Sequence, residues 1–382
     1  MDQGTFEGLL SDFQQHCSSE NNLPDLTASA GRLDAPVVVL VHGIGGNAQH
    51  WTDPISLNPN DTWLFDRNAT PPTHTSGIGS SPPYQAGSVT AWGQTLHDAG
   101  ISYVVWSQTH PNDLLQYSIG EAATVLTALE QHLFAPYEQD IATNGGTVPP
   151  LVILCHSRGG LVTRGALKQL GSAGVPHLRK VITLCTPHHG SFMPALADAY
   201  NNTLSNTINF STLGHDLPGP IAHLVQGRIA PMLADVANHV RQALLHTFGV
   251  LAEGPGFDEL APASATMQAL AQDEQPFPGV QYYAFGGSNP AFIDFFLIEA
   301  GRAFHLLATA SPWLVEQLAR IPGVANEFGG LEELSHGDSA VGPASSHWPD
   351  AYNASYQAFP VNHMQALIDP ALRAATLQAI QA

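Results

Sequence analysis

Short apolar runs rich in Val, Ile and Leu alternate along this chain with segments of helical periodicity. The clearest runs are residues 37–41, 102–106, 151–155, 181–184 and 280–285. Apolar residues recur at helical spacing over 119–133 and again over 159–170. This alternation predicts an α/β protein with a mostly parallel central sheet flanked by helices on both faces.

Three segments interrupt the alternation. Residues 47–87 are dense in Pro, Ser, Thr, Asn and Gly, which predicts an irregular excursion over the surface. Residues 191–279 hold several amphipathic pieces, and 292–330 form a second, apolar insertion. We interpret both insertions as lids or caps over an apolar cleft, with fixed helical packing as the alternative. The whole chain, 1–382, is then one elaborated domain.

The charge balance restricts the class of partner. Acidic residues outnumber Lys and Arg by 32 to 12, so nucleic acids and anionic membrane surfaces should be repelled. A neutral apolar substrate fits better, although the excess could also serve solubility alone. No uninterrupted apolar run reaches the roughly 18 residues of a membrane helix, so no transmembrane segment is expected. The sequence leaves the oligomeric state open.

The cysteines and the first residues bear on the compartment. Cys17, Cys155 and Cys185 are an odd number in a long chain, which is not the pattern of a disulfide framework. Cys155 and Cys185 end apolar runs, so we predict that they are small buried side chains. No secretory signal is visible at residues 1–20, which leaves two possibilities, a cytoplasmic protein or a secreted one whose leader has been removed.

The apolar run 151–155 leads directly into His-Ser157-Arg-Gly-Gly and then into a predicted helix. A tight strand-to-helix turn of this kind exposes a serine hydroxyl above the sheet and aims the following amide at a developing oxyanion. We therefore predict a nucleophile elbow at Ser157, with Cys155 standing where such turns usually carry Gly. The alternative is that Ser157 only caps the helix.

The first run ends in a second informative loop, His42-Gly43-Ile44-Gly-Gly. Its glycines let the backbone turn and leave the Ile44 amide free to form an oxyanion hole with the amide of Arg158. A phosphate-binding loop is the alternative, but the chain lacks both the Gly-Lys-Ser/Thr ending and the Gly-x-Gly-x-x-Gly spacing.

A serine hydroxyl needs a histidine base, and that base needs a carboxylate to orient it. In chains with this kind of elbow the order is Ser, acid, His, and the C-terminal part offers Asp338 in His-Gly-Asp-Ser-Ala-Val and His363 in Pro-Val-Asn-His-Met. We predict a triad of Ser157, Asp338 and His363. The competing side chains are His336 and His347 for the base and Asp294 and Asp350 for the acid.

Taken together, these motifs resemble the bacterial triacylglycerol lipases of the α/β-hydrolase superfamily. The anchors are His42-Gly43, the elbow at 155–160, Thr-Pro-His-His-Gly-Ser at 186–191, Gly-Asp-Ser-Ala-Val at 337–341 and Asn362-His363. A less specific match to the lid region covers 247–251 and 267–270. The resemblance implies an α/β-hydrolase fold with Ser157 as nucleophile, His363 as general base and acid, Asp338 as orienting carboxylate, and Ile44 with Arg158 as oxyanion hole.

The chain also departs from that family. Its lipases carry Leu-Asp after the catalytic histidine, and that carboxylate binds calcium, whereas Met364-Gln365 stand here. We therefore expect no metal or other cofactor, with calcium kept as an open alternative. His188 and His189 could suggest a metal pair, but we favour a structural role because adjacent residues diverge on an irregular loop.

The sequence thus predicts an enzyme that cleaves carboxylic esters through an acyl-enzyme, a lipase-like esterase. One alternative is a polyester- or lactone-cleaving esterase with the same triad. Another is a non-catalytic relative that has kept the pocket. Acyl chain length and natural substrate are not specified by these residues.

Overall fold

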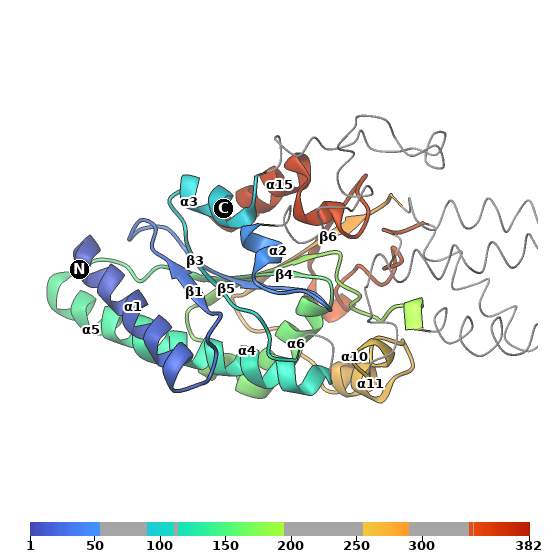
Figure 1. The fold of residues 1–382 in the computed structure, drawn as a ribbon, viewed down its shortest axis with the longest axis horizontal. Helices are drawn as coiled ribbons and strands as arrows, with labels where there is room; N and C mark the ends of the chain where they lie inside the picture. The colour runs from blue at the N-terminus through green and yellow to red at the C-terminus, as the bar shows by residue number, and fades with distance from the viewer. Residues whose placement is uncertain (54–89, 111–113, 195–254, 290–335, 339) are drawn as a thin grey trace, which may run out of the picture.

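The computed structural model describes residues 1–53, 90–110, 114–194, 255–289, 336–338 and 340–382. Within them a seven-stranded sheet has the order β1-β3-β2-β4-β5-β6-β7 (Figure 1). The strands are β1 (Thr27–Ser29), β2 (Val37–Val41), β3 (Ser102–Val105), β4 (Leu151–His156), β5 (Leu178–Leu184), β6 (Gln281–Gly287) and β7 (Ser355–Phe359). Edge strand β1 pairs antiparallel with β3, and the other neighbours are parallel. The carboxyl ends of β2 to β7 therefore meet at one edge of the sheet.

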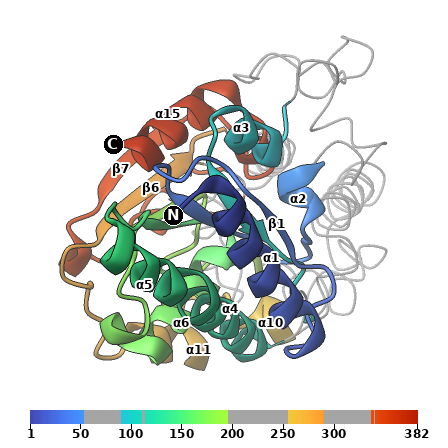
Figure 2. The same cartoon turned by 90° about the vertical axis from the view of Figure 1, so that its left-hand side faces the viewer.

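Helices cover both faces of the sheet (Figures 1 and 2). One face carries α1 (Gln3–Ser19), α4 (Leu115–Leu129), η2 (Glu130–Phe134), α5 (Ala135–Asn144), α6 (Arg158–Gly174), α10 (Pro255–Asp258) and α11 (Ala265–Ala271). The other carries α2 (Gln49–Thr52), α3 (Trp92–Asp98) and α15 (Pro370–Gln381). Two short turns of helix, η6 (Asp350–Tyr352) and η7 (Gln365–Leu367), flank the last strand.

The central strands are buried on both faces, which explains their near-continuous apolar sequence. Every residue of β2 and of β4 is buried. Because side chains alternate along a strand, Val39 and Ile153 belong to the core on the α4 and α6 side, while Leu40 and Leu154 belong to the core on the α15 side. The sheet thus separates two apolar layers and fixes the strand ends firmly.

The predicted fold class, a mostly parallel sheet with flanking helices, is confirmed. The five expected strands correspond to β2 to β6, and the two expected helices to α4 with η2 and to α6. The last helix, α15, begins at Pro370, so His363 lies in a loop ahead of it.

Several predicted segments lie wholly or partly outside the described residues. Of the excursion at 47–87, the structure describes 47–53, where α2 forms. Of the insertion at 191–279 it describes 191–194 and 255–279, and the insertion at 292–330 lies outside altogether. Both lid interpretations, and the single-domain prediction that includes them, stay predictions.

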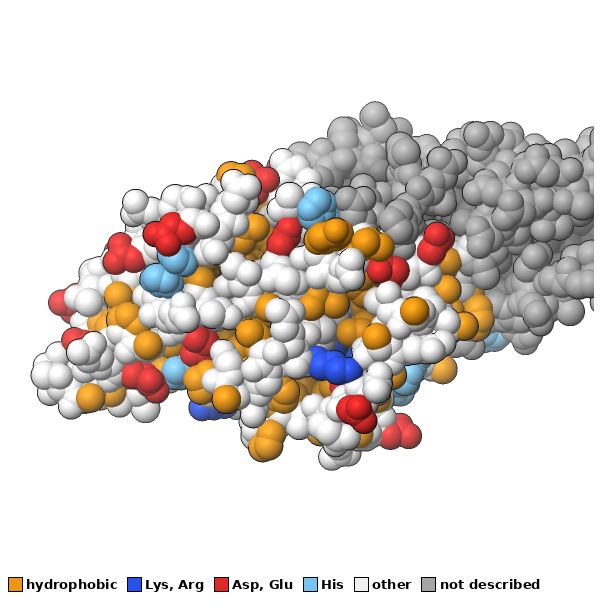
Figure 3. Space-filling model, turned by 90° about the horizontal axis from the view of Figure 1, so that it is seen from below, with side chains coloured by type: hydrophobic (Ala, Val, Ile, Leu, Met, Phe, Trp, Pro, Cys, Tyr) orange, Lys and Arg blue, Asp and Glu red, His pale blue; other side chains and the backbone are white. Residues whose placement is uncertain are grey.

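Three further sequence expectations concern the cysteines, membrane-spanning helices and the balance of charge. Cys155 and Cys185 are buried free thiols, as predicted, and so is Cys17. None of the helices in the described ranges is both long enough and apolar enough to cross a membrane. Acidic side chains are scattered over the face below the sheet, with basic ones sparse (Figure 3).

Candidate active site

Ser157 occupies the sharp turn between β4 and α6. Its backbone has φ 55° and ψ −132°, in the positive-φ region that residues other than glycine rarely adopt. Its amide donates to the Leu184 carbonyl at 2.9 Å, and its carbonyl accepts the Thr186 hydroxyl at 2.9 Å. The Ser157 side chain makes no capping hydrogen bond to the helix, so the helix-cap alternative is wrong.

The two glycines after Arg158 allow the elbow to pack closely. A Cβ on Gly159 would lie 2.5 Å from the Val41 carbonyl oxygen, and one on Gly160 would lie 2.3 Å from the Thr186 hydroxyl. Real Cβ atoms do not approach other atoms so closely, so only glycine fits at both positions. The small residues seen in the sequence are therefore required by contacts with the ends of β2 and β5.

Three side chains far apart in the sequence form one hydrogen-bonded chain. His363 Nε2 lies 2.8 Å from Ser157 Oγ, and His363 Nδ1 lies 2.9 Å from Asp338 Oδ2. Because an ionised carboxylate only accepts, Nδ1 carries the ring proton, and Nε2 of the neutral ring is free to accept the serine hydroxyl. The geometry is that of a base poised to take the Ser157 proton.

Backbone groups fix the Asp338 carboxylate. Its Oδ1 accepts the amides of Ala340 at 2.9 Å and Val341 at 2.7 Å, while the Asp338 carbonyl accepts the His363 amide at 2.8 Å. A Cβ on Gly337 would lie 1.9 Å from the Val341 carbonyl oxygen, so this turn requires glycine. The carboxylate is fully buried and held toward the imidazole.

The competing acid and base candidates lie elsewhere. The hydrogen bond to Ser157 comes from His363, whereas His336 is exposed and the His347 ring stacks on Tyr356. Asp350 begins the exposed end of η6. Asp294 lies outside the described residues. Of the residues proposed from sequence, the structure brings Ser157, Asp338 and His363 into contact.

His156, the histidine that precedes Ser157, also contacts His363. His156 Nε2 lies 2.9 Å from the His363 carbonyl oxygen, and the two rings are 4.9 Å apart. Burial, reinforced by the charge that His363 can carry, holds the pKa of His156 well below its usual range. His156 is therefore neutral, and because a carbonyl only accepts, its proton is on Nε2. Sequence reasoning did not single out this residue.

The His42-Gly43-Ile44 loop lies against the elbow. A Cβ on Gly43 would be 2.8 Å from Ser157 Cβ and 3.2 Å from His156 Nδ1. Among the described residues, no hydrogen-bond acceptor contacts the Ile44 amide. Since Arg158 is the first residue of α6, both predicted oxyanion donors belong to segments that touch Ser157.

A buried polar network supports that loop. His42 Nε2 accepts the Gln108 amide at 2.9 Å, and its Nδ1 lies 2.8 Å from the Gly43 carbonyl oxygen. Burial lowers the pKa of His42 to about 3, so the ring is neutral. The Gln108 side chain also accepts the Arg158 guanidinium at 3.1 Å, and Arg158 donates to Ser118 at 3.2 Å. Gln108 thus joins the two segments that carry the predicted oxyanion donors, a contact that no sequence motif indicates.

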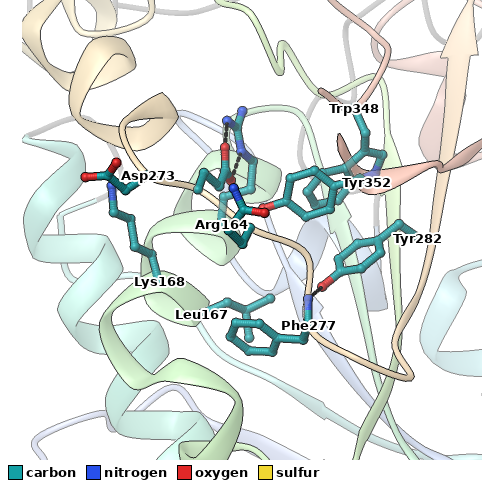
Figure 4. A pocket seen from close by; sticks show the side chains of 10 residues that line it. Arg164, Leu167, Lys168, Asp273, Phe277, Tyr282, Trp348 and Tyr352 are labelled. Atoms are coloured by element: carbon teal, nitrogen blue, oxygen red, sulfur yellow. Dashed lines mark hydrogen bonds and ion pairs between the residues drawn. The ribbon is translucent and has the colours of Figure 1, made fainter. Parts of the chain in front are cut away.

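The loop after β5 is anchored to α6 through Arg164. Arg164 donates to the His188 carbonyl and makes a paired interaction with Glu274, with Nε 2.7 Å from Oε1. His188 Nε2 is 3.0 Å from the Thr183 hydroxyl, and its ring packs 4.2 Å from Trp348. Figure 4 shows Arg164 beside the aromatic side chains of a small adjoining pocket.

These contacts give His188 a structural role. Burial, followed by the Arg164 charge, holds the pKa of His188 well below its usual range. Within the described residues, neither His188 nor His189 belongs to a group of three close metal-ligating side chains. We therefore still favour a structural role for His188 and His189 over a metal pair.

The position of the family's calcium ligand does not suit a cation here. Gln365 is a neutral amide, and its Oε1 already accepts the Asn362 amide at 3.0 Å and the Asn289 side chain at 3.3 Å. Calcium prefers carboxylate and free carbonyl oxygens. The residues at this position therefore do not fit calcium.

The sheet order, the strand–turn–helix at Ser157 and the chain order Ser157, Asp338, His363 define an α/β-hydrolase fold. No protein-family model matches the sequence, and no curated protein matches it significantly. The chain is similar to several solved structures, all at low identity.

Lipase BlEst2 of Bacillus licheniformis in its mature form is 15% identical, over 94% of this chain and 98% of that one, with a TM-score of 0.48. A thermostable carboxyl esterase from Bacillus coagulans is 13% identical over 93% and 92%, with a TM-score of 0.34. Epoxide hydrolases from hot-environment metagenomes are 14% identical over 94% and 96%, with a TM-score of 0.38. At these identities the likeness concerns the fold alone.

Proposed function

We propose that the chain is a serine hydrolase that cleaves carboxylic esters through an acyl-enzyme intermediate. One observation carries the proposal, the continuous contact from Ser157 Oγ through the His363 ring to the buried Asp338 carboxylate. A serine activated in this way attacks carbonyl carbon, whereas a carboxylate nucleophile would be needed to open an epoxide or displace a halide.

In the first half of the reaction, Ser157 attacks the ester carbonyl while His363 Nε2 takes its proton. The ring becomes an imidazolium, which the Asp338 carboxylate stabilises without itself being protonated. The same proton is then given to the leaving alcohol, and the acyl group stays on Ser157. Water activated by His363 releases the acid in the second half.

The Ile44 and Arg158 amides are the proposed donors to the tetrahedral oxyanion. Gly43 packs against Ser157 Cβ, which keeps the Ile44 segment beside the nucleophile. The α6 N-terminus adds the positive end of a helix dipole at the same place. Because both donors are fixed before reaction, little reorganisation is needed when negative charge develops.

The proposed substrate is a neutral, apolar ester. A formal net charge of −20 disfavours anionic substrates, and the nucleophile and base are almost completely buried. The lipase-like assignment rests on the sequence resemblance, and an esterase acting on polyesters or lactones uses the same residues. Substrate trials separate these alternatives, with emulsified long-chain triglyceride, short p-nitrophenyl esters and a polyester film as the three arms.

The test compares the wild type with Ser157→Ala on p-nitrophenyl esters. We expect kcat to fall by several orders of magnitude, on the order of 10⁴- to 10⁶-fold. The matched control is Ser172→Ala, an exposed serine near the other end of the same helix, which should leave kcat unchanged. Circular dichroism and thermal unfolding verify that both variants fold. Equal activity in wild type and Ser157→Ala would overturn the proposal, and a folded wild type inactive on every ester would favour a binding protein.

A further inference from the structure

Cys185 directly follows β5 and lies beside the candidate triad. Its backbone has φ 50°, in the left-handed region that favours glycine, and its amide donates to the Phe285 carbonyl at 2.8 Å. A side chain is thus carried at a position where glycine would be unstrained. Strained residues of this kind cluster at functional sites.

The strained backbone places the thiol against the acid and the base of the triad. The ligand atoms of Cys185, Asp338 and His363 all lie within 4.8 Å of one another. All three residues are at least 98% buried. Within the described part of the chain, no other group of three metal-ligating side chains lies so close together.

The chemistry of these three groups is that of a soft-cation site. Thiolate, imidazole and carboxylate are the ligands that bind Zn²⁺ in proteins, at about 2.0 to 2.3 Å from the ion. Ligand atoms around one ion must then lie roughly 3 to 4 Å apart, and the present ligand atoms lie within 4.8 Å of one another. A thiolate and a carboxylate also neutralise a divalent ion, so the filled site would carry no net buried charge.

We propose that Cys185, Asp338 and His363 form a latent inhibitory site for a soft divalent cation such as Zn²⁺ or Cd²⁺. The inhibitory part rests on the proposed function of the triad. The cation is not a cofactor, because the triad needs Asp338 and His363 unligated to act.

Binding has a defined proton balance. The Cys185 thiol loses one proton to solvent as its sulfur binds the ion. The ring proton of His363 leaves Nδ1, so that Nδ1 can bind the ion. The ring stays neutral and carries its proton on Nε2. Nε2 then cannot accept the Ser157 hydroxyl, so the ring is held in the tautomer that cannot act as a base.

The test titrates the metal-free protein with CdCl₂ and follows two signals. The ultraviolet charge-transfer band of a cadmium thiolate reports binding, and hydrolysis of a p-nitrophenyl ester reports activity. In the wild type we expect one ion per chain and at least a tenfold loss of rate with the same midpoint, reversed by EDTA. The decisive variant is Cys185→Gly, because glycine accepts the left-handed backbone and should fold, and Cys185→Ala is the second.

Both Cys185 variants should lack the band. When each variant's rate is expressed relative to its own metal-free rate, the cadmium concentration that gives half-inhibition should rise at least tenfold. Cys17→Ala and Cys155→Ala, which remove the other buried thiols, should keep both responses. A band that persists in Cys185→Gly, or a wild-type rate unaffected when the band is complete, would overturn the proposal. Ser157→Ala should retain the band, so binding is measured separately from ester hydrolysis.

Discussion

At the scale of single residues, the site depends on backbone conformations that the surroundings impose. Ser157 has a positive φ that costs about 1–3 kcal/mol for such a residue. Hydrogen bonds from its amide and to its carbonyl hold it there, and Gly43, Gly159 and Gly160 permit the close packing. In this strained conformation the Ser157 hydroxyl lies 2.8 Å from His363 Nε2.

Gly43→Ala should therefore impair catalysis more than folding. The added methyl would meet Ser157 Cβ at 2.8 Å and push the Ile44 segment away from the nucleophile. We expect kcat to fall by about 10²-fold, the scale of losing one oxyanion donor. Gly8→Ala is the control, because a Cβ there meets nothing within 4 Å. Steady-state kinetics on a p-nitrophenyl ester decide it, and an unchanged kcat would show that the loop has no part in the reaction.

We predict that His156 is a positioning residue that acts through His363. Its bond to the His363 carbonyl joins the elbow to the loop of the base. His156→Leu removes the donor and should lower kcat by on the order of 10- to 10²-fold with KM little changed, because the base is displaced from the hydroxyl. His156→Gln, which keeps an N–H donor, should recover much of that loss. Equal losses in both variants would argue against the hydrogen bond as the cause.

At the scale of elements, the packing of α4 on α6 supports the helix that begins directly after Ser157. Gly165 on α6 lets Ile119 of α4 approach, since a Cβ on Gly165 would lie 2.4 Å from the Ile119 side chain. Gly120, the next residue on α4, has open space around its own Cβ position. A methyl group is therefore tolerated at Gly120 but excluded at Gly165.

These two glycines give a matched pair of substitutions. Gly120→Ala should stabilise the protein by about 0.5–1 kcal/mol, because alanine favours the helix and meets no neighbour. Gly165→Ala should destabilise it by about 1–3 kcal/mol through overpacking. Chemical denaturation measures both, and a destabilised Gly120→Ala would contradict the described α4 surface.

The same scale shows what sequence can predict. Strands β2 to β6 are marked by β-branched runs because both of their faces are buried, whereas β1 has three residues and β7 is mostly exposed, so neither carries such a run. Ser157, Asp338 and His363 were proposed from local motifs. His156, Gln108 and Cys185 acquire their roles through contacts between distant segments, which no local pattern records.

At the scale of the whole molecule, the site exists only once the sheet is assembled. Ser157 and His363 are separated by 206 positions, and they meet because the ends of β4 to β7 lie at one sheet edge. Assembly also buries several histidines in their neutral form. Burial lowers the pKa of His42 to about 3 and that of His50 to about 4.

Those buried histidines predict acid lability. The unfolded chain takes up protons below the ordinary histidine pKa near 6.5, whereas folded His42 and His50 do not until about 3 and 4, so stability is lost as pH falls through that window. Within that window, each such group lowers the free energy of unfolding by about 1.4 kcal/mol for each unit by which the pH falls. Urea unfolding from pH 7.5 to 5 should show this slope, and His50→Gln should reduce it.

The control is His97→Gln, an exposed histidine on α3 that is hydrated in both states. Its slope should match that of the wild type. Stability that does not fall between pH 6.5 and 5 would contradict the burial of neutral imidazoles.

The most direct test of the central claim, a serine activated by His363, is covalent labelling with a fluorophosphonate followed by peptide mass spectrometry. We expect one adduct per chain, on Ser157, formed far more slowly in a folded His363→Ala variant. Ester turnover by a protein whose Ser157 remains unmodified, or labelling that His363→Ala does not slow, would contradict the account.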